Sequence, residues 1–105
     1  MNENLPSRTK HLSVEELGRM AQVLKLLAHP QRLKIIDLLE TSGEAPVHDL
    51  VARLKLPQSA TSSHLTLMRR VGLVESERRG KEVWYRLGDQ RSLAILNCMR
   101  AKKGA

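Results

Sequence analysis

Residues 58–64, with the sequence QSATSSH, are the stretch whose side chains could do chemistry. They offer hydroxyls and an amide where a solvated helix face normally carries Glu and Lys, and none of them is acidic. Short neutral donors and acceptors at a helix N-terminus can reach base edges and phosphate oxygens, and the helix dipole adds partial positive charge there. The run therefore suits a polyanion, although hydroxyls that only cap a helix would give the same pattern.

A second group of candidate residues is cationic. Arg78, Arg79 and Lys81 surround a glycine in a turn, where neighbouring cations repel one another. We expect them to stabilise nothing local and instead to contact phosphates or a minor groove. The charge distribution favours this interpretation, because residues 1–54 carry 7 basic and 7 acidic side chains and residues 55–105 carry 11 and 4. The net charge of +7 thus arises in the second half of the chain.

A helix, a turn and a second helix are predicted to position the polar run. Apolar residues recur with helical spacing on both sides of a short break, at Val47, Leu50, Val51 and Leu54 before it and at Leu65, Met68 and Val71 after it. Pro57 has no backbone N–H and pushes the preceding residue out of helical geometry, so the second helix restarts at Pro57 or Gln58. The polar run therefore occupies the first two turns of the second helix.

Two further helices precede this pair. Ser13 and Glu16 have the spacing of a capping box, which begins a helix that ends before Pro30. Pro30 starts the next helix, which is predicted to run through Glu40 and to stop at residues 41–43, Thr-Ser-Gly. Apolar residues cover a wide face of this helix, as expected of a central core element.

The rest of the chain completes one small domain. Residues 74–87 alternate as a two-stranded hairpin, and a last helix is predicted from about residue 89 to residue 102. The fold class is therefore mainly α with a small β-hairpin, in one domain of residues 13–103. Residues 1–12 show no periodicity and are expected to form a flexible arm.

Four segments resemble the ArsR/SmtB family of winged-helix bacterial repressors. They are LAHPQRLKII at 27–36, the helix pair at 47–71, GLV at 72–74 and GKEVWYRL at 80–87. The resemblance spans nearly the whole chain, and its most specific part is the first of these segments together with the polar residues of the second predicted helix. It implies a winged helix-turn-helix with about five helices and a two-stranded wing, acting as a sequence-specific DNA-binding repressor.

The resemblance also implies roles for individual residues. Gln58, Ser59 and Ser62 match the family's recognition-helix motif, and helical spacing adds Ser63 and Thr66 to the same face toward the major groove. Arg78, Arg79 and Lys81 would grip the DNA backbone from the wing. The first and last helices have more apolar surface than one small core requires, and the family implies a homodimer through them. Closure of each monomer by its own helices is the alternative.

A homodimer would cover an inverted-repeat operator with half-sites about one helical turn, ~34–36 Å, apart. Repression would follow from obstruction of polymerase. A winged-helix module that binds protein or RNA remains an alternative in this chain, because the same surface could be used in other ways.

The residues that could sense a metal ion or a thiol-reactive signal differ from the family pattern. Metal-sensing members carry a Cys-Val-Cys-type box that would fall at residues 46–48, where only His48 could be a ligand, and the last helix contains no histidine. A site built from His11 and His48 would leave a divalent ion undercoordinated, so no metal or cofactor is expected. Cys98 could act as a redox handle, but we favour a small buried hydrophobe. A metal- or thiol-responsive sensor using His48 or Cys98 stays an alternative.

Other chemistry is excluded by the residues that the chain lacks. No two of its 4 histidines share a helix face, no carboxylates are paired for catalysis and no glycine-rich phosphate loop occurs, so no enzyme is predicted. His29 is expected to cap or pack at a helix junction, and His64 either contacts phosphate or packs beneath the recognition face. The chain has no apolar run of ~20 residues and no signal core, which predicts a cytoplasmic protein without membrane contact.

Overall fold

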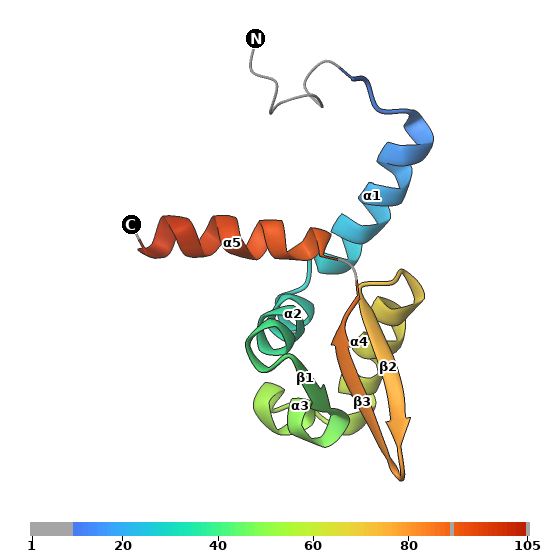
Figure 1. The fold of residues 1–105 in the computed structure, drawn as a ribbon, viewed down its shortest axis with the longest axis vertical. Helices are drawn as coiled ribbons and strands as arrows, with labels where there is room; N and C mark the ends of the chain where they lie inside the picture. The colour runs from blue at the N-terminus through green and yellow to red at the C-terminus, as the bar shows by residue number, and fades with distance from the viewer. Residues whose placement is uncertain (1–9, 89, 105) are drawn as a thin grey trace.

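A computed structural model describes residues 10–88 and 90–104, and the fold that they form is built around α2, Pro30–Ser42. Ile35, Ile36 and Leu39 on this helix are completely buried. They belong to a hydrophobic core to which the other helices and the sheet contribute, and α2 contacts α1, α3, α5 and two of the strands. The predicted central helix is confirmed, and α1, α3, α5, β1 and β3 are arranged around it (Figure 1).

The helix-turn-helix is formed by α3, Val47–Leu54, and α4, Gln58–Arg70, as the apolar spacing predicted. Lys55 closes α3 in the left-handed conformation, with φ of 57°, and its N–H donates to the Val51 carbonyl. Pro57 is the N-cap of α4, so the second helix starts at Gln58. The break at residues 55–57 therefore turns the chain between two helices that pack on each other, and α3 also packs on α2.

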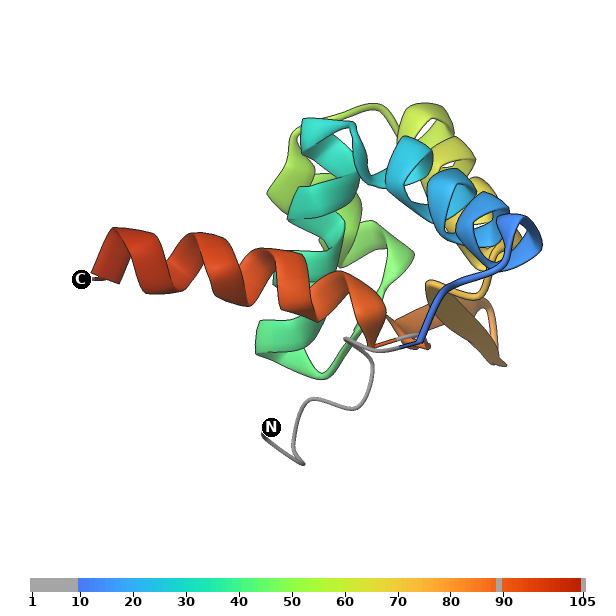
Figure 2. The same cartoon turned by 90° about the horizontal axis from the view of Figure 1, so that it is seen from above.

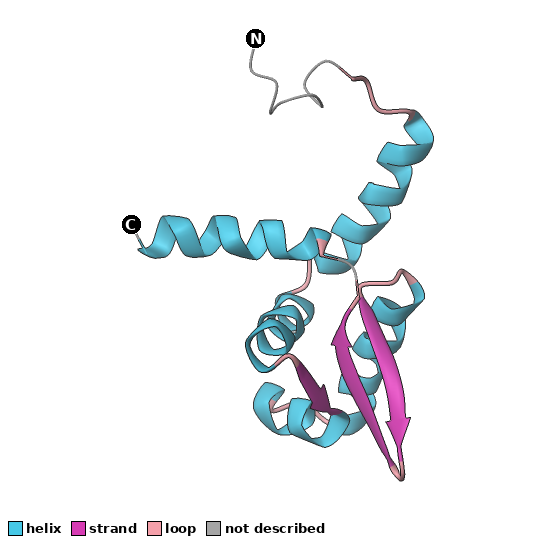
Figure 3. Cartoon of the chain, viewed as in Figure 1, coloured by secondary structure: helices cyan, strands magenta, loops and turns pink. Residues whose placement is uncertain are grey.

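The sheet has one strand more than predicted. β1, Glu44–Pro46, pairs antiparallel with β3, Glu82–Leu87, which also pairs with β2, Val74–Arg79, giving the order β1-β3-β2 (Figure 3). No strand was predicted at residues 44–46 from the sequence. Three residues ending in proline carry no alternation, and this strand forms because β3 supplies its hydrogen-bond partners. The predicted hairpin of residues 74–87 is confirmed.

Two helix ends also differ from the sequence-based expectation. α2 continues through residues 41 and 42, where the Thr41 Oγ1 donates to the Asp37 carbonyl at 2.9 Å, and it ends at Gly43 with φ of 83°. A helix tolerates a threonine whose hydroxyl bonds back to the preceding turn, although composition alone indicates a loop at these residues. α5 spans Arg91–Gly104, slightly later than the predicted range, and residue 89 lies outside the described residues.

The first and last helices lie at the end of the molecule away from the hairpin tip. α1, Val14–Leu27, begins with the predicted capping box, in which Ser13 and Glu16 exchange hydrogen bonds at 3.1 and 3.3 Å. α1 and α5 diverge from a common point above α2 and the sheet, and α5 projects well beyond the rest of the fold (Figures 1 and 2). The predicted arm falls mostly on residues 1–9, which lie outside the described residues.

Candidate nucleic-acid interface

The first turns of α4 present uncharged polar side chains on one side of the helix. Gln58, Ser59 and Ser63 are exposed, and Ser62 and Thr66 are half-buried. At 3.6 residues per turn these five positions fall within an arc of about 140°. The structure therefore brings the five helix residues predicted for DNA contact together on one surface, which we call the polar face of α4.

The opposite side of α4 packs into the hydrophobic core. Thr61 is completely buried, and its Oγ1 donates to the Pro57 carbonyl at 3.2 Å. Leu65 and Met68 are buried on the same side of the helix. No side chain caps the N-terminus of α4, and its first turn has no acidic residue, so backbone N–H groups and the positive end of the helix dipole remain available to an anion.

Arg70 is a cation that the sequence analysis did not assign to this face. It is exposed near the end of α4 and lines a hollow of about 400 Å³ together with Ser62, Ser63, Thr66 and Leu67. The signal was present in the sequence, because Arg70 lies seven residues, or about two turns, after Ser63. The polar face thus acquires a positive charge at its C-terminal end.

A second hollow, of about 290 Å³, lies between the start of α4 and the hairpin tip. Gln58 and Ser62 line it from α4, and Lys81 and Glu82 line it from the hairpin. His48 borders it from α3, and its Nδ1 lies 2.9 Å from a Glu82 carboxylate oxygen. The polar run and Lys81, one of the three hairpin cations, therefore meet at this hollow.

The expectation that the three hairpin cations stabilise nothing local is wrong for Arg79. Its Nη1 and Nη2 donate to the two carboxylate oxygens of Glu44 at 2.7 and 2.9 Å, and its guanidinium lies 4.6 Å above the Trp84 ring. These hydrogen bonds lower the pKa of Glu44. Sequence reasoning missed the pair because its members are 35 residues apart. Arg78 and Lys81 are exposed and form no ion pair within the described part of the chain.

His64 packs beneath the polar face, one of the two roles expected for it. Its Nδ1 accepts a hydrogen bond from the Arg32 Nε at 3.1 Å, and its ring meets the His29 ring edge-on with centroids 4.6 Å apart. Burial, together with the charges of His29 and Arg32, lowers the pKa of His64. His29 caps α2 by accepting from the Gln31 N–H at 3.2 Å, which confirms its predicted role.

The candidate sensing residues are not gathered into a site. Within residues 10–88 and 90–104, no three His, Cys, Asp or Glu side chains are close enough to share a metal ion. Cys98 on α5 is exposed, so the interpretation of this residue as a small buried hydrophobe is wrong for the single chain. Its neighbours Asn97 and Met99 are exposed as well.

Apolar side chains are exposed on α1 and α5. Val14, Leu17 and Leu24 on α1 are 83%, 50% and 47% exposed, and Met99 on α5 is 58% exposed. Leu12, just before α1, is also exposed. A single chain therefore leaves uncovered much of the surplus apolar surface that the sequence placed on its first and last helices.

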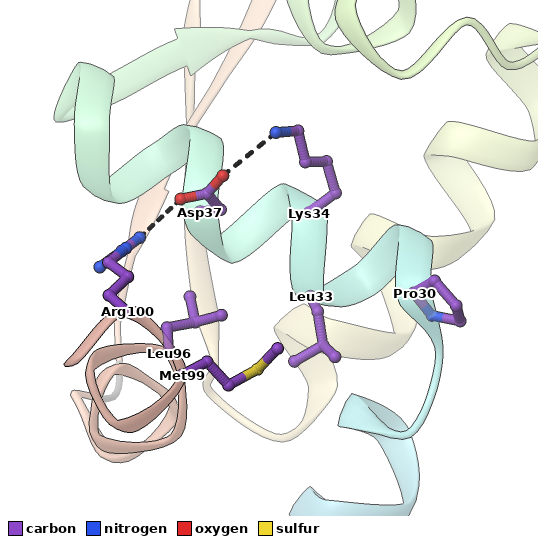
Figure 4. A pocket seen from close by; sticks show the side chains of 7 residues that line it. All are labelled: Pro30, Leu33, Lys34, Asp37, Leu96, Met99 and Arg100. Atoms are coloured by element: carbon purple, nitrogen blue, oxygen red, sulfur yellow. Dashed lines mark hydrogen bonds and ion pairs between the residues drawn. The ribbon is translucent and has the colours of Figure 1, made fainter. Parts of the chain in front are cut away.

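A hollow of about 540 Å³ separates α2 from α5. Leu33 on α2 and Leu96 and Met99 on α5 supply its apolar wall, and an ion pair between Asp37 and Arg100, at 2.5 Å, closes one side (Figure 4). The hydrogen bond from Arg100 is the main cause of a lowered pKa for Asp37. This hollow lies between the central helix α2 and α5, one of the two helices predicted to form the dimer, rather than beside the polar face of α4.

The helix-turn-helix, the adjoining hairpin and the acid-free polar face define a winged helix-turn-helix protein of the class that regulates transcription by binding DNA. The sequence model of the arsR family of bacterial regulatory proteins matches residues 29–76, from the start of α2 into β2. The chain belongs to the ArsR/SmtB family.

Individual relatives agree with this assignment. The chain is 33% identical over 92 residues to the transcriptional repressor PagR of Bacillus anthracis, covering 88% of this chain and 89% of PagR. It is 41% identical over 75 residues to the transcriptional repressor SmtB of Mycobacterium tuberculosis, covering 71% of this chain and 55% of SmtB. The chain thus spans about half the length of that relative.

A solved structure resembles the fold over nearly its whole length. The homodimeric winged helix-turn-helix DNA-binding domain Mb0332 from Mycobacterium bovis superposes with a TM-score of 0.74 at 25% identity, covering 99% of this chain and 91% of that chain. The predicted fold class and family are therefore confirmed. None of the described helices combines the length and apolar character that crossing a bilayer requires.

Proposed function

We propose that the protein is a transcriptional repressor that binds operator DNA as a homodimer, with α4 in the major groove and the hairpin as a wing on the neighbouring backbone. The residues that we assign to DNA contact are Gln58, Ser59, Ser62, Ser63, Thr66, Arg78 and Lys81. Residues 13–103 would form the DNA-binding and dimerisation domain, acting in the cytoplasm by obstructing polymerase at an inverted repeat.

The observation that carries this proposal is the position of the polar face relative to the hairpin cations. Gln58 and Ser62 share a hollow with Lys81, so one surface combines donors that can read base edges with charge that can bind phosphate. No acidic residue lies on α4 to repel the backbone. A surface of this kind serves a duplex better than a flexible single strand, because it has no exposed aromatic stacking platform among the described residues.

The exposed apolar side chains of α1 and α5 support the homodimer. A second copy placed against these helices would cover Val14, Leu17, Leu24 and Met99, which water otherwise contacts. The homodimeric state named for the Mycobacterium bovis relative agrees with this arrangement. Two α4 helices related by a two-fold axis would then address half-sites ~34–36 Å apart.

The test is fluorescence anisotropy with the duplex upstream of the protein's own coding region and a scrambled duplex, across a salt series. We expect tight, sequence-selective binding whose logarithmic affinity falls steeply with the logarithm of salt concentration. Arg78→Gln and Lys81→Gln each remove one cation from both wings of the dimer, so each should reduce the magnitude of that slope by about 2.

Arg19→Gln is the matched control. It removes the same charge from α1, at the far end of the molecule from the hairpin tip, and should leave the slope unchanged (Figure 1). Weak binding that is equal on both duplexes would contradict the proposal and would favour a protein partner for the same surface.

A further inference from the structure

The two faces of the sheet carry different kinds of side chain. Because alternate residues of a strand point to opposite faces, Ser76 and Arg78 share one face with Tyr85, which is buried toward the helices. The Ser76 hydroxyl also lies 3.4 Å from the Arg69 Nη1 of α4, so this inner face is turned toward α4. Arg79 belongs to the opposite, outer face.

On the outer face Arg79 spans all three strands. It starts on β2, passes over Trp84 on the central strand β3 at 4.6 Å, and reaches Glu44 on β1. Its Nε and Nη2 also donate to the Glu77 carboxylate at 3.2 and 2.9 Å. Four hydrogen bonds therefore engage a guanidinium that has five N–H donors, and little of it remains for a phosphate.

We propose that Arg79 is a positioning residue of the wing, which through its bridge to Glu44 fixes the angle of the hairpin tip so that Arg78 and Lys81 reach the DNA backbone. This inference rests on the proposed function, and it separates Arg79 from the cations that would touch DNA. Bidentate pairing to a carboxylate specifies direction as well as distance, so Glu44 and Arg79 together hold the outer strands in one orientation across β3.

The hairpin needs such a bridge because of its shape. Two-stranded ribbons twist more strongly and are less stable than larger sheets, and β1 supports β3 over only three residues at its base. The tip, with Gly80 at φ of 64°, extends beyond β1 without a third strand (Figure 3). A bridge from Arg79, next to the tip, back to Glu44 therefore acts where pairing with β1 has ended.

The first test asks in which direction a single substitution changes the affinity for DNA. Glu44→Gln removes a negative charge near DNA, so if Arg79 contacts phosphate the freed guanidinium should tighten binding. If Arg79 positions the wing, the same substitution should weaken binding about fivefold to tenfold, as expected when one or two phosphate contacts are misplaced. Glu75→Gln is the matched control, because Glu75 lies on the same outer face and pairs with Arg86 at 3.2 Å near the base of the hairpin. It should not weaken binding.

A double-mutant comparison distinguishes positioning from general destabilisation. In a background of Arg78→Gln with Lys81→Gln the wing has no phosphate contacts left to position, so Glu44→Gln should then have almost no effect on affinity. An undiminished loss in that background would overturn the proposal, and so would affinity equal to or above that of the parent when Glu44→Gln is made alone.

A measurement without DNA examines the bridge itself. Trp84 is the single tryptophan of the chain, so acrylamide quenching of its fluorescence reports on the guanidinium that covers its ring. Glu44→Gln should raise the quenching constant about twofold, whereas Glu75→Gln should not. An unchanged quenching constant in Glu44→Gln would overturn the proposed bridge, regardless of how the substitution changes DNA affinity. If the parent protein binds no duplex, the proposed function fails, and the quenching result still decides whether Arg79 is held by Glu44.

Discussion

Arg32 donates from its Nε to the Nδ1 of His64 at 3.1 Å, and this contact joins the start of α2 to the middle of α4. The same Arg32 also donates from Nη1 to the Leu26 carbonyl at 3.2 Å in the last turn of α1. The helix proposed to read DNA is thereby bonded to the junction of α1 and α2. Only a neutral His64 can accept at Nδ1, so this connection depends on its protonation state.

The first prediction concerns the pH dependence of stability. In the folded protein the pKa of His64 lies below its ordinary value of 6.5, because burial and the neighbouring His29 and Arg32 disfavour the cation. As pH falls below 6.5, the unfolded chain therefore binds a proton more readily than the folded protein does, and stability decreases. We expect the contribution of His64 to be present at pH 7.5 and to decline as pH approaches 5, measured by urea unfolding at a series of pH values.

His64→Gln supplies the control for this prediction. At pH 7.5 the variant should be less stable than the parent by about 1 kcal/mol, because it loses packing against His29. The difference in unfolding free energy between the parent and the variant should decrease toward pH 5, because the glutamine side chain has no proton to bind. A gap that stays constant with pH would show that His64 does not cause the acid sensitivity.

The elements of this fold were predictable where local pattern decides them. Pro57 and the apolar spacing around it predicted both helices of the helix-turn-helix, and the α4 serines that were assigned to DNA contact lie on one side of that helix. Local sequence patterns did not predict contacts between residues that lie far apart in the chain. Nothing near Glu44 or Arg79 in the sequence indicates that they pair, and β1 exists only because β3 is beside it. For this reason neither the apolar periodicity nor the charge distribution could predict the Arg79–Glu44 bridge that we assign to wing positioning.

A second prediction tests the polar face by charge. Ser62→Glu or Ser63→Glu places a carboxylate where phosphates and base edges are expected, and each should weaken DNA binding by about 2–3 kcal/mol, or roughly 30-fold to 150-fold. Ser62→Ala and Ser63→Ala keep the helix and remove at most one hydrogen bond, with an expected loss of about 1 kcal/mol. Anisotropy titrations supply the affinities, and circular dichroism verifies folding. Equal losses for Glu and Ala would argue against a DNA-facing surface.

A third prediction concerns the dimer. Leu17→Glu puts a charge on the exposed apolar side of α1, and it should raise the dimer dissociation constant by about 100-fold or more, because a charge within an apolar interface lacks both water and a partner. Sedimentation velocity measures the change. Binding to the full operator should fall with it, since the two half-sites would no longer be bound as a unit.

Gln22→Glu is the corresponding control on the same helix. Gln22 is exposed and lies about 140° around α1 from Leu17, so its substitution adds the same charge to the polar side. The dimer should persist in this variant. A Leu17→Glu protein that remains dimeric would place the interface on another surface and would leave the exposed residues of α1 unexplained.

The last prediction compares two glycines whose surroundings differ. A Cβ at Gly88 would lie 2.6 Å from the Gly72 carbonyl oxygen, in the place where the end of β3 meets the turn between α4 and β2. The Gly88 N–H also donates to the Leu73 carbonyl at 2.9 Å, so the backbone cannot move away without losing that bond. Gly88→Ala should therefore destabilise the protein by about 1–3 kcal/mol, measured by thermal or urea unfolding.

Gly18 offers the opposite case, because no atom lies within 4 Å of its virtual Cβ and it occupies the interior of α1. Gly18→Ala should stabilise the protein by roughly 0.5–1 kcal/mol through the lower entropy of the unfolded chain and the better helix propensity of alanine. The two substitutions add the same methyl group, so their difference in sign isolates the close approach at Gly88. Similar effects at both positions would mean that the turn before β2 yields to the added methyl group, and that β3 and α4 are joined less tightly than the Gly88–Leu73 bond implies.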